Sequence, residues 1–143
     1  FVLGIDCSQN ANITAKKNSL KLSAKNVSFL DMDIFKNFPS ENFDIVISNP
    51  PYIPKNEFNS LMKDVRAFEP EIALTDNKDG LNFYQRYADL SKNLIKENGL
   101  LILEVGRDNH PFEVKNIFKE RGYNNICTYD DFNGDTRVIA VRF

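Results

Sequence analysis

The tetrapeptide Asn49-Pro50-Pro51-Tyr52 combines residue types suited to holding a planar nitrogen group. Its two prolines remove two backbone donors and keep Asn49 and Pro50 out of helical conformation, so the loop is stiff. The Asn49 side-chain carbonyl and the Pro50 main-chain carbonyl can then accept from one NH₂ group, while the Tyr52 ring offers a flat face to an amide or a base. Proline pairs also occur in plain turns, but this pair follows the apolar run Phe43 to Ser48, which favours a binding role.

Acidic residues follow other apolar runs. In an open α/β sheet, ligands bind outside the carboxyl ends of the strands, and Asp6, Asp33, Asn49 and Glu104 are expected there. Asp6 could accept hydrogen bonds from the two hydroxyls of a ribose. Alternatively, Asp6 could cap the next helix or solvate a turn, and its position alone favours this structural role. Glu104 fits a structural and a functional role equally well. His110 is expected only to precede Pro111 at a helix start.

These residues must be positioned by strands that alternate with helices. Near-continuous apolar runs, typical of strands buried on both faces, predict four strands: Phe1 to Ile5, Val27 to Leu30, Phe43 to Ile47 and Leu100 to Val105. Helical spacing predicts three helices: one with Ala11, Ala15 and Leu22 on its inner face, one from Leu81 to Lys96 with Gly99 just past its end, and one from Pro111 to Gly122.

The tail predicts a reversed strand. Asn125 to Tyr129 and Arg137 to Phe143 are β-like and flank the turn signal Asn133-Gly134, so they should pair antiparallel. The fold class is therefore α/β, with a mostly parallel sheet and a terminal antiparallel strand. The segment 53–78 has no clear periodicity, which is typical of a lid or a disordered connection.

Composition narrows the classes of function. The chain has 143 residues, 42% of them hydrophobic, and a net charge of −2, which indicates one folded domain and disfavours affinity for nucleic acid through many phosphate contacts. Two cysteines, Cys7 and Cys127, and one histidine make neither a disulfide framework nor a zinc site, so no metal is expected. No run approaches the roughly 18 apolar residues of a membrane span. These features predict a cytoplasmic protein without a membrane partner.

The tetrapeptide and its preceding strand resemble the signature of S-adenosylmethionine-dependent methyltransferases that act on exocyclic or amide nitrogens. Further blocks are similar, in order along the chain, to the release-factor glutamine methyltransferases, the HemK/PrmC family: Val65 to Pro70 with Ala73-Leu74, Asp79 to Leu81 with Phe83-Tyr84, Leu103 to Gly106, Asp131-Phe132 with Gly134-Asp135, and Arg137-Val138. The fold that this resemblance implies is the Rossmann-like methyltransferase sheet.

The resemblance also implies roles. Asp6 matches the acidic residue that holds the cofactor ribose, and Asp33, Ile34 and Phe35 match the segment that brackets the adenine. Asn49 touches both cofactor and substrate, and the whole tetrapeptide, including Pro50, Pro51 and Tyr52, matches the catalytic clamp on the substrate amide. The implied cofactor is S-adenosylmethionine, and the implied partner is a peptide chain release factor, methylated on the glutamine of its Gly-Gly-Gln motif.

Two departures stand beside the resemblance. Asn109 occupies a place where the family usually has glutamine, and none of the six glycines forms the family's cofactor loop. That loop, with the first strand, lies upstream of Phe1 in the family. Residues 1–143 are therefore expected to be the C-terminal two-thirds of the catalytic domain, without the family's N-terminal helical domain, and a chain so truncated could be inactive or could oligomerise through unpaired strand edges.

An amide nitrogen is a weak nucleophile, so in-line placement and preorganised acceptors are expected to matter more than a strong base. Three alternatives remain at this point. A methyltransferase acting on adenine or guanine amino groups of DNA or RNA would need a basic face. A NAD-type nucleotide-binding domain would leave the proline loop unexplained. A catalytically incomplete fragment could serve protein interaction through the segment 53–78.

Overall fold

The computed structural model describes residues 1–143 as an α/β protein with two compact units, Phe1–Ser40 (unit 1) and Glu41–Phe143 (unit 2). Unit 1 contains a parallel pair of strands, β1 (Val2–Asp6) and β2 (Val27–Asp31), in which Val2 pairs with Val27 and Asp6 with Asp31. Unit 2 contains a separate four-stranded sheet. The predicted strands are present, but they form two sheets and not one.

Unit 1 also contains α1 (Gln9–Lys21), which begins after Ser8 because the Ser8 hydroxyl accepts a hydrogen bond from the Ala11 N–H. The predicted inner face of this helix is wrong for two of its three residues, while the third, Ala15, is half-buried. Ala11 is exposed, and Leu22 lies beyond the helix with 79% of its surface exposed. The buried side chain of α1 is the polar Asn12, which is 2% exposed.

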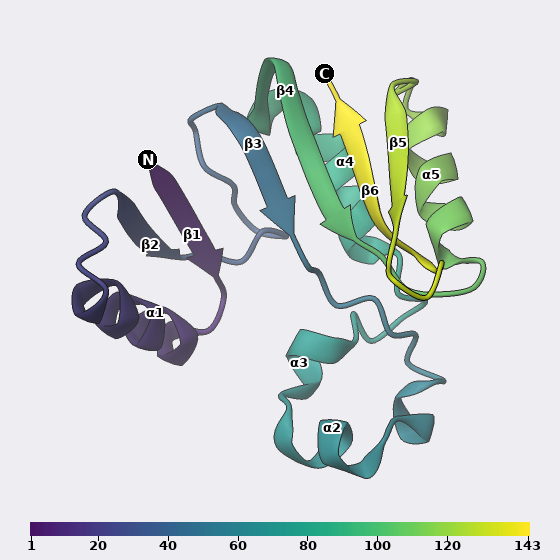
Figure 1. Cartoon of the computed structure of the whole chain (residues 1–143), viewed down its shortest axis with the longest axis horizontal. Coiled ribbons are helices and arrows are strands. Elements are labelled where there is room, and N and C mark those ends of the chain that lie inside the picture. The colour runs from purple at the N-terminus through teal and green to yellow at the C-terminus, as the bar shows by residue number, and fades with distance from the viewer. The chain divides into compact units, whose positions relative to one another are not determined.

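The sheet of unit 2 has the order β3-β4-β6-β5. Its strands are β3 (Phe43–Ser48), β4 (Ile95–Glu104), β5 (Ile126–Asp130) and β6 (Thr136–Arg142). β3 and β4 are parallel, and β6 runs antiparallel to both of its neighbours, β4 and β5. This confirms a mostly parallel sheet whose last strand in the chain is reversed, and Figure 1 shows that strand between β4 and β5.

Two helices, α4 (Asn82–Leu94) and α5 (His110–Glu120), lie on the same face of this sheet (Figure 1). The core of unit 2 forms there from apolar side chains of both layers, including Tyr84, Leu94, Leu101, Leu103, Val114, Phe118, Ile139 and Val141. The prediction of strands buried on both faces is wrong for β1, β2 and β3, none of which contains a buried residue, and in β3 Ile45 and Ile47 are 52% and 73% exposed.

The boundary between α4 and β4 also differs from the prediction. The helix ends at Leu94 and the strand begins at Ile95, with the register shifting between the pairs Phe43–Ile95 and Ile45–Leu100. Gly99 lies in this irregularity, where a Cβ atom would come within 2.9 Å of the Asp44 carbonyl oxygen. The glycine that suggested a helix end therefore permits a close approach of two strands.

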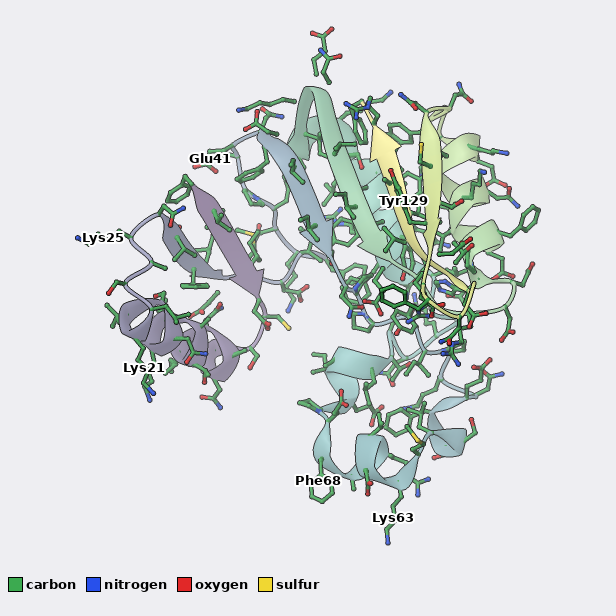
Figure 2. The ribbon with its side chains drawn as sticks, viewed as in Figure 1. Lys21, Lys25, Glu41, Lys63, Phe68 and Tyr129 are labelled. Carbon is green, nitrogen blue, oxygen red and sulfur yellow. The ribbon has the colours of Figure 1, made fainter.

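The segment 53–78 contains the short helices η1 (Phe58–Ser60), α2 (Lys63–Phe68) and α3 (Glu71–Leu74), which periodicity did not predict. Backbone hydrogen bonds join its two ends, from Ile53 N–H to Leu74 O at 3.0 Å and from Lys55 N–H to Lys78 O at 2.8 Å. Figure 2 shows Lys63 and Phe68 pointing outward from α2. The segment is thus a closed loop of short helices that extends beyond the carboxyl end of β3 (Figure 1).

Candidate active site

The loop Asn49–Tyr52 leaves the carboxyl end of β3 in unit 2. Asn49 is exposed and makes no hydrogen bond within its unit, whereas Pro50 is buried. Pro51 and Tyr52 are half-buried. Because the prolines cannot donate, the loop presents an amide side chain and main-chain carbonyls from a conformationally restricted backbone.

Hydrogen bonds fix the Tyr52 hydroxyl group. It donates to Glu104 Oε1 at 3.1 Å and accepts from Arg137 Nη2 at 3.0 Å. Arg137 Nη2 also donates to Glu104 Oε1 at 3.0 Å, and the guanidinium carbon lies 5.5 Å from the Tyr52 ring centroid. The Glu104 carboxylate is therefore a partner of Tyr52 and Arg137, which answers the question that its sequence position left open.

Gly80 lies directly against the Tyr52 backbone. Gly80 has φ +84° and is buried, and a Cβ atom there would overlap the Tyr52 carbonyl. The Asp76 carboxylate accepts hydrogen bonds from the backbone N–H groups of Gly80 and Asn82, each at 3.0 Å, and so shapes this turn at the start of α4. Only glycine combines this φ with such a close approach.

His110 connects this turn to the end of β4. Its Nδ1 accepts from the Gly106 N–H at 3.1 Å, so a neutral ring carries its proton on Nε2, which donates to the Gly80 carbonyl at 3.2 Å. Burial lowers the pKa of His110, which favours this neutral form. The prediction that His110 only precedes a proline is incomplete, since its ring joins two backbone segments.

Two tyrosines of α4 hold the ends of β3 and β4. Tyr84 donates to the Glu104 carbonyl at 2.7 Å, and Tyr87 donates to the Ser48 hydroxyl at 2.9 Å. Burial raises the pKa of Tyr84 and of Tyr87, so both hydroxyls stay protonated donors. Ser48, which precedes the loop Asn49–Tyr52, and Glu104, which binds Tyr52, are therefore both hydrogen-bonded to α4.

In unit 1, Asp6 ends β1 with an exposed carboxylate. Its Oδ1 accepts from the Ser8 N–H at 2.7 Å, so the predicted turn-forming role of Asp6 is present. Asn12 Nδ2 donates to the carbonyls of Asp6 and Leu30, at 3.0 and 3.2 Å, and to Asp31 Oδ1 at 2.7 Å. The carboxyl ends of β1 and β2 are thus joined by one buried amide.

Asp33 and Ile34 lie in the turn after β2 and are half-buried. Asp33 Oδ1 accepts from the Phe35 N–H at 3.0 Å, and Asp33 Oδ2 lies 3.1 Å from Lys36 Nζ. The predicted site residues therefore fall in both units, Asp6, Asp33 and Ile34 in unit 1 and Asn49 to Tyr52 in unit 2.

The sequence did not indicate the partners of Tyr52. Arg137 is 85 positions away from Tyr52 and Glu104 is 52 positions away, so no local pattern joins them. The sequence did contain a pattern that could have indicated the role of Tyr84 and Tyr87, since two tyrosines three positions apart share one face of a helix.

No cluster of His, Cys, Asp and Glu has the arrangement of a metal site. None of the helices combines the length and apolar character needed to cross a membrane.

The α/β fold is that of S-adenosylmethionine-dependent methyltransferases, and the Asn-Pro-Pro-Tyr loop follows β3, an edge strand of the unit 2 sheet. The N-methyltransferase NodS of Bradyrhizobium japonicum, solved with S-adenosyl-L-homocysteine, has this fold: 98% of this chain and 65% of NodS superimpose with a TM-score of 0.57 at 14% identity. The chain belongs to the family described as Eco57I restriction-modification methylase, whose model matches residues 4–106.

Curated relatives carry a more specific name. The release factor glutamine methyltransferase of Fusobacterium nucleatum is 34% identical over 99% of this chain and 40% of its own length. The protein of the same name from Clostridium acetobutylicum is 48% identical over 71% of this chain and 36% of its own length. The chain therefore spans less than half the length of these relatives, and its similarity to release factor glutamine methyltransferases extends over nearly all of it.

Proposed function

We propose that this chain is the C-terminal part of the catalytic domain of a methyltransferase that uses S-adenosylmethionine to methylate the glutamine side-chain amide in the Gly-Gly-Gln motif of peptide chain release factors. The observation that carries the proposal is the loop Asn49–Tyr52, in which an unpaired amide stands beside an aromatic ring held by Glu104 and Arg137. The names of the relatives support the substrate.

The residues of unit 1 fit the cofactor. Asp6 ends a parallel strand with an exposed carboxylate, of which Oδ1 is used by the Ser8 N–H, and Oδ2 remains for a ribose hydroxyl. The turn at Asp33 and Ile34 follows β2, the strand that pairs with β1, and we propose that the adenine of the cofactor lies against this turn.

In the proposed mechanism the residues of this chain act mainly by orienting the substrate amide nitrogen toward the methyl group of the cofactor. S-adenosylmethionine supplies a methyl group on a sulfonium sulfur. The Asn49 side-chain carbonyl and the Pro50 main-chain carbonyl accept from the two N–H bonds of the substrate amide and orient its nitrogen. Transfer of the methyl group would build positive charge on the substrate nitrogen, the Asn49 and Pro50 carbonyls would stabilise that charge, and the nitrogen would then lose one proton to solvent. Orientation of this kind is worth about 7–11 kcal/mol in well-placed reactions.

A release factor is a protein substrate, so the enzyme needs a surface that binds it. Met62, Phe68 and Ile72, in the segment 53–78, are 74%, 84% and 63% exposed. Aromatic side chains and methionine are enriched at protein interfaces, so this segment is suited to contact a release factor. We place an N-terminal helical domain in the remainder of the full-length protein, and we place the protein in the cytoplasm, where chain termination occurs.

The family description favours a second candidate, a methyltransferase acting on amino groups of DNA bases. An Asn-Pro-Pro-Tyr loop can hold either kind of planar NH₂ group. The charge opposes this candidate, because 18 basic residues against 20 acidic residues leave no excess of positive charge for phosphates.

The test is methyl transfer by the full-length protein from labelled S-adenosylmethionine to a release factor, to the same release factor with its motif glutamine replaced by alanine, and to duplex DNA. We expect label on the first alone. Asn49→Ala should abolish transfer with little change in the melting temperature, and Asn93→Ala, which alters an exposed asparagine of α4 outside the segment 53–78, should leave transfer intact. Label on DNA but not on the release factor would contradict the proposal.

A further inference from the structure

We propose that Glu104 and Arg137 are positioning residues of the reaction, which hold the Tyr52 ring as a fixed wall of the amide site. This inference rests on the proposed function. It concerns residues that do not belong to the tetrapeptide and that lie at the ends of β4 and β6.

The first step is that the Tyr52 hydroxyl is fully engaged. It donates to Glu104 and accepts from Arg137, and these two side chains are also bonded to each other, so the three groups form a closed ring of hydrogen bonds. The hydroxyl is therefore not available to take the substrate proton. What Tyr52 offers to a substrate is the face of its ring.

The second step is that the anchor of Tyr52, which is the pair Glu104 and Arg137, is itself rigid. The Glu104 carbonyl accepts from buried Tyr84 at 2.7 Å, and the Val105 N–H donates to the Arg137 carbonyl at 2.9 Å. The backbone of both anchoring residues is therefore held by the sheet and by α4. Tyr52 is fixed at its hydroxyl by this anchor, and the next residue, Ile53, donates its backbone N–H to the Leu74 carbonyl at 3.0 Å.

The third step is that this ion pair should contribute little to the stability of the fold. The Arg137 and Glu104 side chains are 22% and 35% exposed, and ion pairs that reach solvent typically add little to stability. An error of about 1 Å in placement, in contrast, can lower turnover about 100-fold. The anchor should therefore matter more for turnover than for the folded state.

The experiment measures kcat and KM of the full-length protein for methyl transfer to a release factor, with Tyr52→Phe, Glu104→Gln, Arg137→Met and Arg137→Lys. We expect kcat to fall about 10- to 100-fold for Arg137→Met, less for Arg137→Lys, which keeps one donor, while the Kd for S-adenosylmethionine stays constant. Arg137→Met added to Tyr52→Phe should cause little further loss, because both remove the same anchor.

Lys96→Met is the matched control, since it breaks an exposed ion pair with Asp44 at the other end of β3. We expect it to keep wild-type kcat. Two results would overturn the positioning role alone, provided that the wild-type protein is active. In the first, the Glu104 and Arg137 variants keep wild-type kcat. In the second, the loss of kcat in these variants adds fully to the loss caused by Tyr52→Phe. A wild-type protein that methylates no amide would overturn the proposed function and, with it, this role.

Discussion

Every buried hydrophobic side chain of this chain lies in unit 2, between Tyr84 and Val141, whereas the buried residues of unit 1 are Asn12 and Pro39. Unit 2 is therefore stabilised by apolar burial, at about 1.5–3 kcal/mol for each large side chain. In unit 1 the strands pair through their backbones, Asn12 is the buried polar side chain, and the apolar side chains other than Pro39 are half-buried or exposed. The residues proposed for the cofactor lie in the polar unit, and those proposed for the substrate amide lie in the apolar one.

This difference teaches that the residues proposed for the cofactor and those proposed for the substrate amide are held in place by different interactions. Tyr52 is held by side chains and turns that join a packed core. Asp6 and Asp33 lie on a parallel pair with little apolar support. A ligand that binds the folded form of unit 1 would add directly to its stability, so the cofactor itself is expected to order that unit.

The largest effect should come from the core of unit 2. Phe118 is 0% exposed and packs against Tyr123 with ring centroids 5.8 Å apart. Phe118→Ala should lower the free energy of unfolding by about 3–5 kcal/mol, as measured by urea denaturation. Phe132→Ala removes a fully exposed ring and should change it little. Equal losses for the two variants would contradict the assignment of the core.

An intermediate effect should come from Asn12 in unit 1. Asn12→Ala leaves the Asp6 and Leu30 carbonyls without their buried donor and should cost about 1–3 kcal/mol. Hydrogen exchange should quicken in β1 and β2 and stay unchanged in β4 and β6. Asn18→Ala, at an exposed position of α1, is the control. Faster exchange in the core strands of unit 2 would show that the units do not respond separately.

The sequence predicted local features well because local chemistry determines them. The apolar runs of β3 and of the β5–β6 hairpin, the proline at the start of α5 and the stiff loop at Asn49 all follow from neighbouring residues. The anchor of Tyr52 could not be predicted in this way, since Arg137 meets it only after three strands have paired. The α1 face was predicted wrongly because a polar residue, Asn12, takes the inner position for its hydrogen bonds.

The smallest effect should be a pH dependence that His110 adds to unit 2. Burial lowers the pKa of His110 below its ordinary value of 6.5, and its Nδ1 must stay unprotonated to accept from Gly106. As the pH falls below 6.5, the unfolded chain binds a proton that the folded chain does not, so stability decreases until the lower folded-state pKa is reached. Above 6.5 this contribution is constant.

Urea denaturation at about pH 7.5 and about pH 5.5 measures this loss, with His110→Gln as the variant that does not titrate. Glu113, Asp76 and Arg137 also act on the ring, the two carboxylates favouring protonation and the guanidinium opposing it. These three groups remain in the variant, so the additional loss of the wild type between the two pH values belongs to His110. An equal loss in both proteins would show that the folded chain accommodates a proton on Nδ1, and it would contradict the lowered pKa of His110.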